Sequence, residues 1–271
     1  MSTQQSRAEI FKAFHDRPQP LLLPNPWDAG SAKLFADMGF EALASTSLGA
    51  SAIHGRTVAN ADSVLENLKA ICAATHLPVN ADLENCFADA PEEAAKMMAQ
   101  ACEAGAVGAS IEDATGVREA PIYDFDLTVE RVQAAVEAVR TLSIPFMLTA
   151  RAEGLLCGHG DIDEIIKRLQ AYEAAGADCL YAPGLKTIAE MKIVMAAVSK
   201  PVNIVMGFAD PNITLAELAE IGVRRVSIGA GLYRAAMTTA VNAAQEMKDG
   251  GFTFVNDMIS VRNLRTAFGE I

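Results

Sequence analysis

Long hydrophobic runs, a surplus of basic residues and paired cysteine motifs are all missing from this sequence of 271 residues. No apolar segment approaches the roughly 20 residues that span a bilayer, and the start, Met1 to Arg7, lacks the apolar region of a signal peptide. With 34 acidic and 22 basic residues, the net charge of −12 opposes non-specific binding to nucleic acid or anionic lipid. We therefore expect a soluble, cytoplasmic protein that binds neither nucleic acid nor membranes.

The cysteines also lack a pattern. They are odd in number, scattered and never in Cys-x-x-Cys spacing, which argues against a disulfide framework or a zinc site. Their positions are Cys72, Cys86, Cys102, Cys157 and Cys179. We expect reduced thiols, most of them packed as small apolar residues. Cys86 has no evident partner nearby that would lower its pKa.

Hydrophobic residues make up 51% of the chain, which is enough to bury a substantial core. No break in composition divides the chain, so we predict a single domain over residues 1–271. Residues 1–17 are expected to form a preceding helix, and residues 250–271 a C-terminal extension with a further short helix near 257–268.

Two recurring phrases mark where the predicted elements end and begin. In the first, a helix end is followed by a glycine, which can adopt the left-handed cap conformation, and then by a β-rich run. These glycines are Gly39, Gly105, Gly176 and Gly222. In the second, a helix is followed by a proline that opens an apolar run, because the first residue of a strand needs no ladder donor. These prolines are Pro78, Pro145 and Pro201.

The phrases divide the chain into eight strands that alternate with eight helices. The strands begin near residues 21, 41, 78, 107, 145, 178, 201 and 224. The helices cover residues 28–38, 60–74, 91–104, 128–141, 161–175, 186–198, 214–221 and 231–248. This alternation predicts an α/β protein with a parallel sheet and right-handed crossovers, and eight strands are the number that closes as a (β/α)8 TIM barrel.

Carboxylates stand at the ends of two neighbouring strands, where the active site of such a barrel lies. Asp82 and Glu84 end the third strand and point to the same side, and Glu112 ends the fourth. Because neighbouring strands lie about 4.8 Å apart, the three acids can surround one cation. Oxygen ligands without histidine or cysteine favour Mg²⁺ or Mn²⁺ over zinc. The alternative is that these acids form salt bridges with Arg151 or contact helix N-termini at the barrel rim.

Arg151 ends the fifth strand and is expected to face these acids across the barrel mouth. Its fixed fork of donors can hold a carboxylate with two hydrogen bonds, or stabilise charge on an enolate oxygen. A purely structural arginine is the alternative. Together with the acids, Arg151 favours a metal ion and a small carboxylate substrate.

Six phrases resemble the isocitrate lyase/phosphoenolpyruvate mutase superfamily, in order from about residue 20 to 245. They are Leu23-Pro-Asn-Pro-Trp-Asp28, Asn80-Ala-Asp-Leu-Glu84, Ile111-Glu-Asp-Ala-Thr-Gly116, Leu148-Thr-Ala-Arg151, Leu180-Tyr-Ala-Pro-Gly184 and Pro201-Val-Asn203. The resemblance implies a TIM barrel whose eighth helix is swapped onto a partner subunit in a homodimer or homotetramer. It also implies Mg²⁺, a 2-oxo acid substrate, and the cleavage or formation of C–C or P–C bonds through a pyruvate enolate.

The resemblance also implies roles for individual residues. Asp82, Glu84 and Glu112 match magnesium-binding acids, some of which act through water. Arg151 matches an arginine near the substrate's C1 carboxylate and C2 oxygen. The other positions that match substrate contacts are Ser45, Thr46, Ser47, Asn203 and Arg234.

Some segments depart from the pattern of the superfamily. True isocitrate and methylisocitrate lyases carry a Lys-Lys-Cys-Gly-His loop whose cysteine is the general acid, and residues 113–127 do not supply it. Phosphonate-acting members have Lys, Asn and Ser in this loop, whereas residues 114–121 read Ala-Thr-Gly-Val-Arg-Glu-Ala-Pro. His54 stands where the family places an aspartate, and it is either a general acid or base or a surface turn residue.

These observations predict a magnesium-dependent carbon–carbon lyase that acts on a small 2-oxo or 2-hydroxy dicarboxylate. Oxaloacetate decarboxylation is the simplest candidate, because it needs an electron sink but little help from an acid. The alternatives are a phosphonopyruvate-type P–C enzyme, a hydrolase of a pyruvate derivative, a phosphate- or flavin-binding barrel and a non-catalytic barrel. A Schiff-base aldolase is disfavoured because Lys186 and Lys200 lie outside the predicted mouth.

Overall fold

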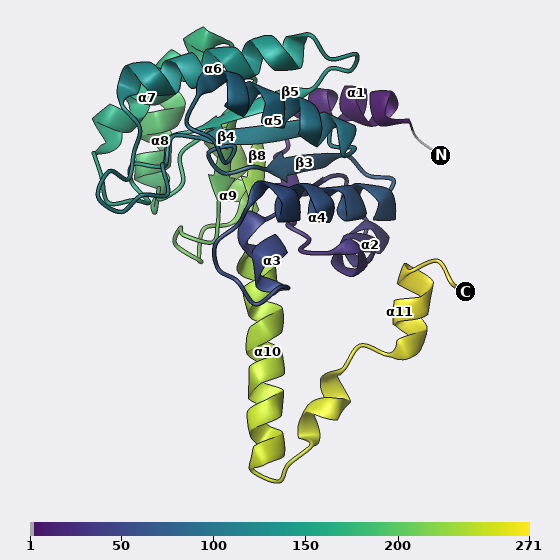
Figure 1. Cartoon of the computed structure of the whole chain (residues 1–271). Coiled ribbons are helices and arrows are strands. Elements are labelled where there is room, and N and C mark those ends of the chain that lie inside the picture. Colours follow the sequence, from purple (N-terminus) through teal and green to yellow (C-terminus); the bar gives the residue numbers. More distant parts are fainter. Residues whose placement is uncertain (1–2) are drawn as a thin grey trace.

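A parallel eight-stranded sheet forms the centre of the computed structural model, which describes residues 3–271 (Figure 1). The strands follow the order β1-β8-β7-β6-β5-β4-β3-β2 around the sheet. They are β1 (Leu21–Leu23), β2 (Leu43–Ala44), β3 (Val79–Asp82), β4 (Gly108–Glu112), β5 (Met147–Arg151), β6 (Cys179–Tyr181), β7 (Val202–Val205) and β8 (Arg225–Ser227). The Ala44 amide donates to the Pro24 carbonyl at 3.2 Å across the last seam, so the sheet curls into a nearly closed barrel. The predicted (β/α)8 fold is confirmed.

Helices follow the strands in turn and cover the outside of the barrel. They are α2 (Ala29–Asp37), α3 (Ser47–Ala52), α4 (Ala61–Ala74), α5 (Pro91–Glu103), α6 (Phe125–Arg140), α7 (Ile162–Ala175), α8 (Ile188–Ala197) and α9 (Leu215–Glu220). Their bounds agree with the sequence prediction to within about three residues except for α3, which was not predicted. Its sequence, Ser-Leu-Gly-Ala-Ser-Ala, shows no helical period and lacks the Thr-x-x-Glu start that marks α9, a helix of the same length. Its absence from the prediction matters, since α3 begins at a residue of the candidate site.

Side-chain caps and glycines set the helix ends. Capping boxes open α2, α8 and α9, with Asp28, Thr187 and Thr214 accepting hydrogen bonds from backbone amides in the first turn. Gly176 closes α7 with a φ of 103°, in the left-handed region that a residue with a side chain rarely adopts. The left-handed caps expected from the recurring glycines are therefore present.

Apolar side chains pack in two clusters. The larger lies between the strands and the surrounding helices and includes Leu43, Ile111, Leu148 and Ile204. The smaller lies at the beginnings of the strands, where Phe11 of α1 (Gln4–Phe14) is fully buried. Helix α1 thus plugs the end of the barrel opposite the carboxyl ends of the strands. It accounts for the helix predicted at residues 1–17, of which residues 1 and 2 lie outside the described part of the chain.

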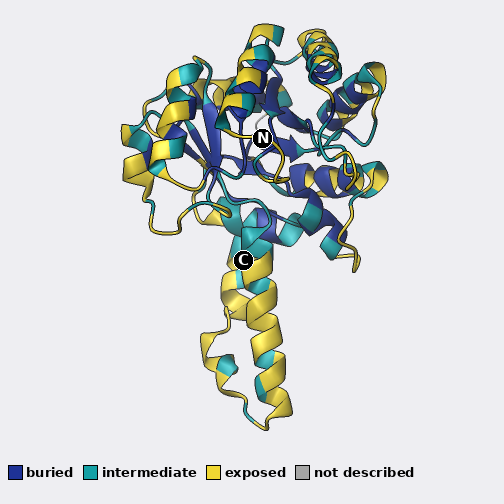
Figure 2. Ribbon diagram, turned by 90° about the vertical axis from the view of Figure 1, so that its left-hand side faces the viewer, coloured by how far each residue is buried: buried dark blue, intermediate teal, exposed yellow. Residues whose placement is uncertain are grey.

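Helix α10 (Gly231–Lys248) leaves the barrel instead of covering it (Figures 1 and 2). None of its residues is buried. The chain then turns back through a 3-10 helix, η1 (Thr253–Asp257), to α11 (Val261–Ala267), which packs against α2, where Lys33 Nζ donates to the Phe268 carbonyl at 3.1 Å. On the barrel wall next to this departure, Leu22 of β1 is 39% exposed. No helix within residues 3–271 combines the length and the apolar character that crossing a bilayer requires.

Candidate active site

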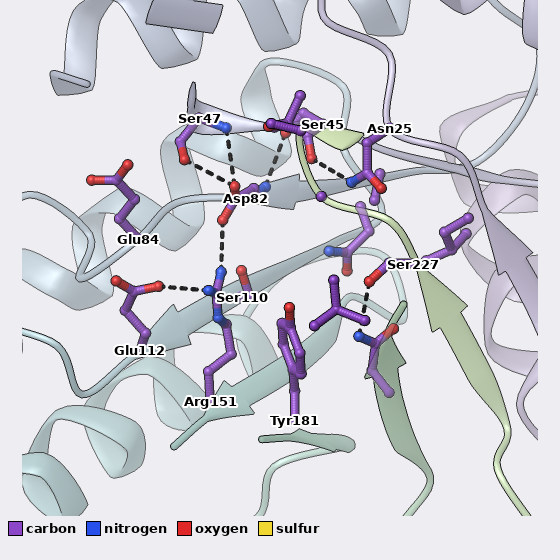
Figure 3. Close-up of a pocket in the computed structure, with 18 of the residues that line it drawn as sticks. Asn25, Ser45, Ser47, Asp82, Glu84, Ser110, Glu112, Arg151, Tyr181 and Ser227 are labelled. Carbon is purple, nitrogen blue, oxygen red and sulfur yellow. Dashed lines mark hydrogen bonds and ion pairs between the residues drawn. The ribbon is translucent and has the colours of Figure 1, made fainter. Parts of the chain in front are cut away.

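A cavity of about 310 Å³ opens at the carboxyl ends of the strands (Figure 3). Its walls come from all eight strands and from the loops that follow them. The polar lining residues include Asn25, Ser45, Thr46, Ser47, Asn80, Asp82, Glu84, Ser110, Glu112, Arg151, Glu153, Tyr181, Asn203, Arg225 and Ser227. Apolar side chains of Leu156 and Phe208, both partly exposed, lie at the same cavity. A concave site of this size with a few convergent polar groups suits a small polar ligand.

Arg151 is the hub of the acidic side of this cavity (Figure 3). Its Nη1 lies 2.9 Å from Asp82 Oδ1, its Nη2 lies 3.0 Å from Glu112 Oε2, and its Nε donates to Glu153 Oε1 at 2.7 Å. The guanidinium carbon also lies 4.8 Å from the centre of the Tyr181 ring. One guanidinium therefore ties together acids at the ends of β3 and β4 and in the loop after β5. The salt bridges foreseen as an alternative for Asp82 and Glu112 are present.

The segment after β2 donates hydrogen bonds to the second carboxylate oxygen of Asp82, Oδ2. The Ser47 amide and the Ser47 hydroxyl both donate to Asp82 Oδ2, each at 3.0 Å. In return, the Asp82 amide donates to Ser45 Oγ at 2.9 Å. Because Ser47 is the first residue of α3, the short helix fixes the position of these donors beside β3. The Asp82 side chain is thus oriented from both sides, by Arg151 and by Ser47.

Glu84 lies in a loop with an unusual backbone. Glu84, Cys86 and Phe87 all have positive φ values, of 50°, 63° and 55°. Such values are uncommon for residues with side chains and tend to occur at functional sites. Arg131 of α6, which is fully buried, holds the loop by donating to the carbonyl of Asp89 at 2.6 Å and to those of Asn85 and Ala88. The guanidinium thus offsets part of the cost of the strained loop.

Burial and the crowding of like charges raise the pKa of three acids at the cavity, Glu84, Glu112 and Glu153. Burial raises the pKa of Glu112 well above its usual value, although Arg151 opposes the shift and neighbouring acids add to it. Burial likewise raises the pKa of Glu84, with repulsion from Asp82 as the next cause, and the pKa of Glu153. Four acids thus crowd the Arg151 side of the cavity, and three of them, Asp82, Glu112 and Glu153, contact its guanidinium, so negative charge exceeds positive charge there.

This shortage of positive charge fits a divalent cation, and the donors are carboxylate oxygens of the kind that Mg²⁺ prefers. The three predicted ligands do not form a ready-made cage, however. Within residues 3–271 no three Asp, Glu, His or Cys side chains are placed to hold one ion together. Arg151 takes up an oxygen each of Asp82 and Glu112. Any ion here would be held by fewer direct protein ligands, as Mg²⁺ usually is.

Asp113, which follows Glu112, has a structural role. It is fully buried and accepts hydrogen bonds from the Glu153 amide at 2.7 Å and from the Tyr172 hydroxyl at 2.7 Å. Arg168 Nη1 lies 3.2 Å away as a counter-ion. Asp113 therefore joins the ends of β4 and β5 and helps set the spacing of the acids that precede and follow it.

Opposite the acids, a second polar group lines the cavity. Asn203 of β7 donates from Nδ2 to Ser227 Oγ at 3.0 Å and accepts from Arg225 Nε at 2.9 Å. Asn25 donates to the Ser45 carbonyl at 3.0 Å and accepts from the Ile228 amide at 3.1 Å. Asn25 thus links the loops after β2 and β8.

The structure brings most of the sequence-predicted residues to one cavity. Those that line it are Ser45, Thr46, Ser47, Asp82, Glu84, Glu112, Arg151 and Asn203. His54 and Arg234 are exposed and lie outside its lining. Burial raises the pKa of the Cys86 thiol to about 12, which makes an unreactive thiol. The sequence analysis named none of Asn25, Ser227 and Arg225 as a site residue, although the position of Ser227 at the carboxyl end of β8 was a usable signal.

Acids, serines and an arginine at the carboxyl ends of the strands are typical of barrel enzymes that bind small anions. Comparison with known proteins identifies the family. The sequence model for phosphoenolpyruvate phosphomutase matches residues 11–248. The chain therefore belongs to this family, within the isocitrate lyase/phosphoenolpyruvate mutase superfamily, as its motifs predicted.

Individual relatives cover nearly the whole chain. A solved structure of a protein from Burkholderia cenocepacia J2315 is 49% identical with a TM-score of 0.95, covering 98% of this chain and 96% of that one. The 2-methylisocitrate lyase of Escherichia coli is 26% identical over 276 residues, covering 95% of this chain and 90% of its own. Oxaloacetate decarboxylase 1 of Pseudomonas putida is 30% identical over 224 residues, covering 78% and 74%.

Proposed function

We propose that this protein is a magnesium-dependent carbon–carbon lyase that acts on a small 2-oxo or 2-hydroxy dicarboxylate, with oxaloacetate decarboxylation as the first candidate. The observation that carries the proposal is Arg151, which lies among Asp82, Glu112 and Glu153 at the carboxyl ends of the strands. The similarity to an oxaloacetate decarboxylase and a 2-methylisocitrate lyase supports the reaction class.

We propose that Asp82, Glu84 and Glu112 hold the Mg²⁺, some of them through water. When bound, the ion would supply a Lewis acid for the 2-oxo group. The buried donors of the Ser45–Ser47 segment would orient the substrate carboxylate, since Ser45 and Ser47 are already held in place beside Asp82. The Arg151 fork would stabilise the negative charge that develops on the C2 oxygen as the C–C bond breaks. Ser45, Ser47 and Arg151 are held by hydrogen bonds and ion pairs before a substrate binds, which lowers the reorganisation that these three groups would need.

Turnover of purified protein with oxaloacetate tests the proposal directly. We expect pyruvate and carbon dioxide in equal amounts, in a reaction that stops with EDTA and resumes with Mg²⁺. Phosphonopyruvate serves as the second substrate, because the matching family model belongs to a phosphomutase. If the protein released phosphate from phosphonopyruvate but cleaved no 2-oxo or 2-hydroxy dicarboxylate, the result would contradict a C–C lyase and favour a P–C bond enzyme.

We also propose that the protein assembles as a homodimer or homotetramer in which α10 covers the barrel of a partner subunit. An isolated helix in water is only marginally stable without packing, yet none of the 18 residues of α10 is buried. Met237, Ala240, Val241 and Ala244 recur at helical spacing and give α10 an apolar face. A groove lined by Leu22, Met38 and Phe40 remains on the barrel wall where an eighth helix would pack.

A further inference from the structure

Tyr181 carries a hydroxyl group that is open to the candidate site. It is the last residue of β6, its exposed fraction is 9%, and it lines the same cavity as Arg151. Among residues 3–271 no group forms a hydrogen bond with this hydroxyl. Unlike the unpaired Nη1 of Arg225, the hydroxyl oxygen is not sealed in the protein interior. A ligand in the cavity can therefore reach it.

The register of the sheet places Tyr181 between the two polar groups of the cavity. It pairs with Arg151 of β5 on one side and with Asn203 of β7 on the other. The Arg151 guanidinium carbon lies 4.8 Å from the centre of the Tyr181 ring, so the ring is held against a cation. Figure 3 shows the hydroxyl pointing away from β6 into the middle of the cavity. The ring is thus fixed while its polar end remains available.

The proposed reaction needs a proton donor that the other parts of the chain do not supply. Loss of carbon dioxide from oxaloacetate leaves an electron pair on C3, which must take up a proton. The loop over residues 113–127 contains no cysteine that could act as the general acid. His54, which the sequence offered for acid or base chemistry, is exposed and lies outside the cavity lining. The donor must therefore belong to the cavity itself.

The Tyr181 hydroxyl is the group of the cavity that suits this task. A phenol ordinarily has a pKa of about 10, whereas a serine hydroxyl does not ionise in the ordinary pH range. The Ser47 hydroxyl is already used as a donor to Asp82. A carboxylate that binds a metal ion or pairs with a guanidinium has no proton to give. Burial raises the pKa of Tyr181, although Arg151 opposes the shift, so the hydroxyl is protonated at neutral pH.

We propose that the Tyr181 hydroxyl is the proton donor of the reaction and delivers its proton to C3 of the pyruvate enolate. As the C–C bond breaks, its electron pair moves into the enolate. The O–H bond of Tyr181 then breaks, and a C3–H bond forms. The phenolate beside the Arg151 guanidinium takes up a proton from water that enters through the open cavity. This assignment rests on the proposed function, which supplies the enolate.

Exchange of the methyl hydrogens of pyruvate with heavy water tests the assignment, because exchange needs the proton transfer but no C–C cleavage. We would follow the methyl signal by proton NMR at saturating Mg²⁺. Tyr181→Phe removes one hydroxyl and keeps the ring, and it should slow exchange at least about 100-fold, as the loss of a general acid does. Oxalate mimics the enolate but takes up no proton on carbon, so its dissociation constant by calorimetry should change by less than about threefold.

Two further measurements separate proton transfer from structure. The matched control is Tyr233→Phe, because the Tyr233 ring of α10 packs on Trp27 with centres 5.8 Å apart and lies outside the cavity lining. It should exchange pyruvate at the wild-type rate. Carbon dioxide release from oxaloacetate by Tyr181→Phe should fall by a smaller factor than exchange does, because cleavage itself depends on the groups that stabilise the enolate.

An unchanged exchange rate in Tyr181→Phe would overturn the assignment. An equal loss of oxalate binding would also overturn it, by showing a role in binding alone, and so would a wild-type protein that binds oxalate but exchanges no pyruvate hydrogens. The two proposals fail separately. Exchange that depends on Tyr181, without cleavage of any 2-oxo or 2-hydroxy dicarboxylate, would remove the lyase reaction and keep the proton donor. Cleavage of oxaloacetate with exchange that does not depend on Tyr181 would keep the reaction and remove the role of Tyr181.

Discussion

Ser47 donates two hydrogen bonds to the same carboxylate oxygen of Asp82, from its amide and from its hydroxyl, each at 3.0 Å. The two residues are 35 positions apart in the chain and lie at the ends of neighbouring strands. The other Asp82 oxygen lies 2.9 Å from Arg151 Nη1. Asp82 is thus held through both of its carboxylate oxygens, and it is the first residue to test.

Replacing Asp82 by alanine should abolish metal-dependent turnover while leaving the fold intact. The change removes a proposed magnesium-binding acid together with the partner of Arg151, so we expect kcat/KM to fall by at least about 10³-fold, or roughly 4 kcal/mol. Steady-state kinetics with oxaloacetate and circular dichroism would measure the two effects. Activity equal to that of the wild-type protein would contradict a role for Asp82 in metal binding. The control is Asp62→Ala, because Asp62 is exposed on α4 and lies outside the cavity.

Oxalate, a mimic of the pyruvate enolate, should stabilise the protein only when Mg²⁺ is present. A ligand selective for the folded state at 100 times its dissociation constant adds about 2.7 kcal/mol to the free energy of unfolding. We expect the melting temperature to rise with oxalate and Mg²⁺ together, and to change little with either alone or after EDTA. Glu112→Gln should weaken this joint effect. Stabilisation by phosphate but not by oxalate with Mg²⁺ would favour a phosphate-binding barrel.

Arg131→Met should destabilise the protein strongly. The substitution leaves the carbonyls of Asn85, Ala88 and Asp89 without their donor and releases the loop in which Glu84 lies. Unsatisfied buried groups cost about 1–3 kcal/mol each, so we expect the free energy of unfolding to fall by about 3 kcal/mol or more. Urea unfolding measures the change. Arg118→Met, at an exposed arginine, should change it by less than about 0.5 kcal/mol, and equal effects would contradict the role of Arg131.

The histidine under the barrel floor should make stability depend on pH. Burial, aided by Arg225 of β8 and by Arg17, lowers the pKa of His15 from 6.5 to about 3, while its bond to the Phe11 carbonyl opposes the shift. Because the unfolded chain binds the proton more readily, His15 costs stability as the pH falls from 6.5 towards 3, and nothing above 6.5.

At pH 5 this cost amounts to about 2 kcal/mol relative to pH 7. The His15→Gln variant, which keeps a hydrogen-bonding side chain but cannot titrate, should lose this part of the pH dependence. Urea unfolding of both proteins at pH 7 and pH 5 measures the difference. Parallel losses of stability in the two proteins would show that His15 is already accommodated as a cation.

Val241→Asp should shift the protein towards the monomer if α10 packs on a partner. Val241 is 66% exposed on α10, and a charge placed in an apolar interface costs several kcal/mol. Light scattering coupled to gel filtration across a range of concentrations measures the shift. Thr239→Asp, on the opposite side of the same helix, is the matched control. An unchanged mass for Val241→Asp would contradict helix swapping.

Local sequence patterns predicted the barrel fold and most of the acids at the carboxyl ends of its strands. Recurring glycines and prolines mark the ends of helices and the starts of strands because left-handed caps and missing ladder donors are properties of single residues. Asp82 and Glu112 could also be assigned to the barrel mouth from local sequence, because each carboxylate ends an apolar strand and cannot lie unpaired in the core. Helix α3 escaped prediction because its six residues carry no detectable period.

Relations between distant residues had to come from the folded chain. The sharing of Arg151 by three acids, the clamp of Arg131 on the loop after β3 and the hydrogen bonds of Arg225 all join residues that lie far apart in sequence. The departure of α10 from the barrel was implied only by the resemblance to the superfamily, since its own composition is that of an ordinary amphipathic helix. Propensity and alternation act over a few residues, whereas burial, counter-ions and unpaired donors depend on which strands become neighbours when the barrel closes.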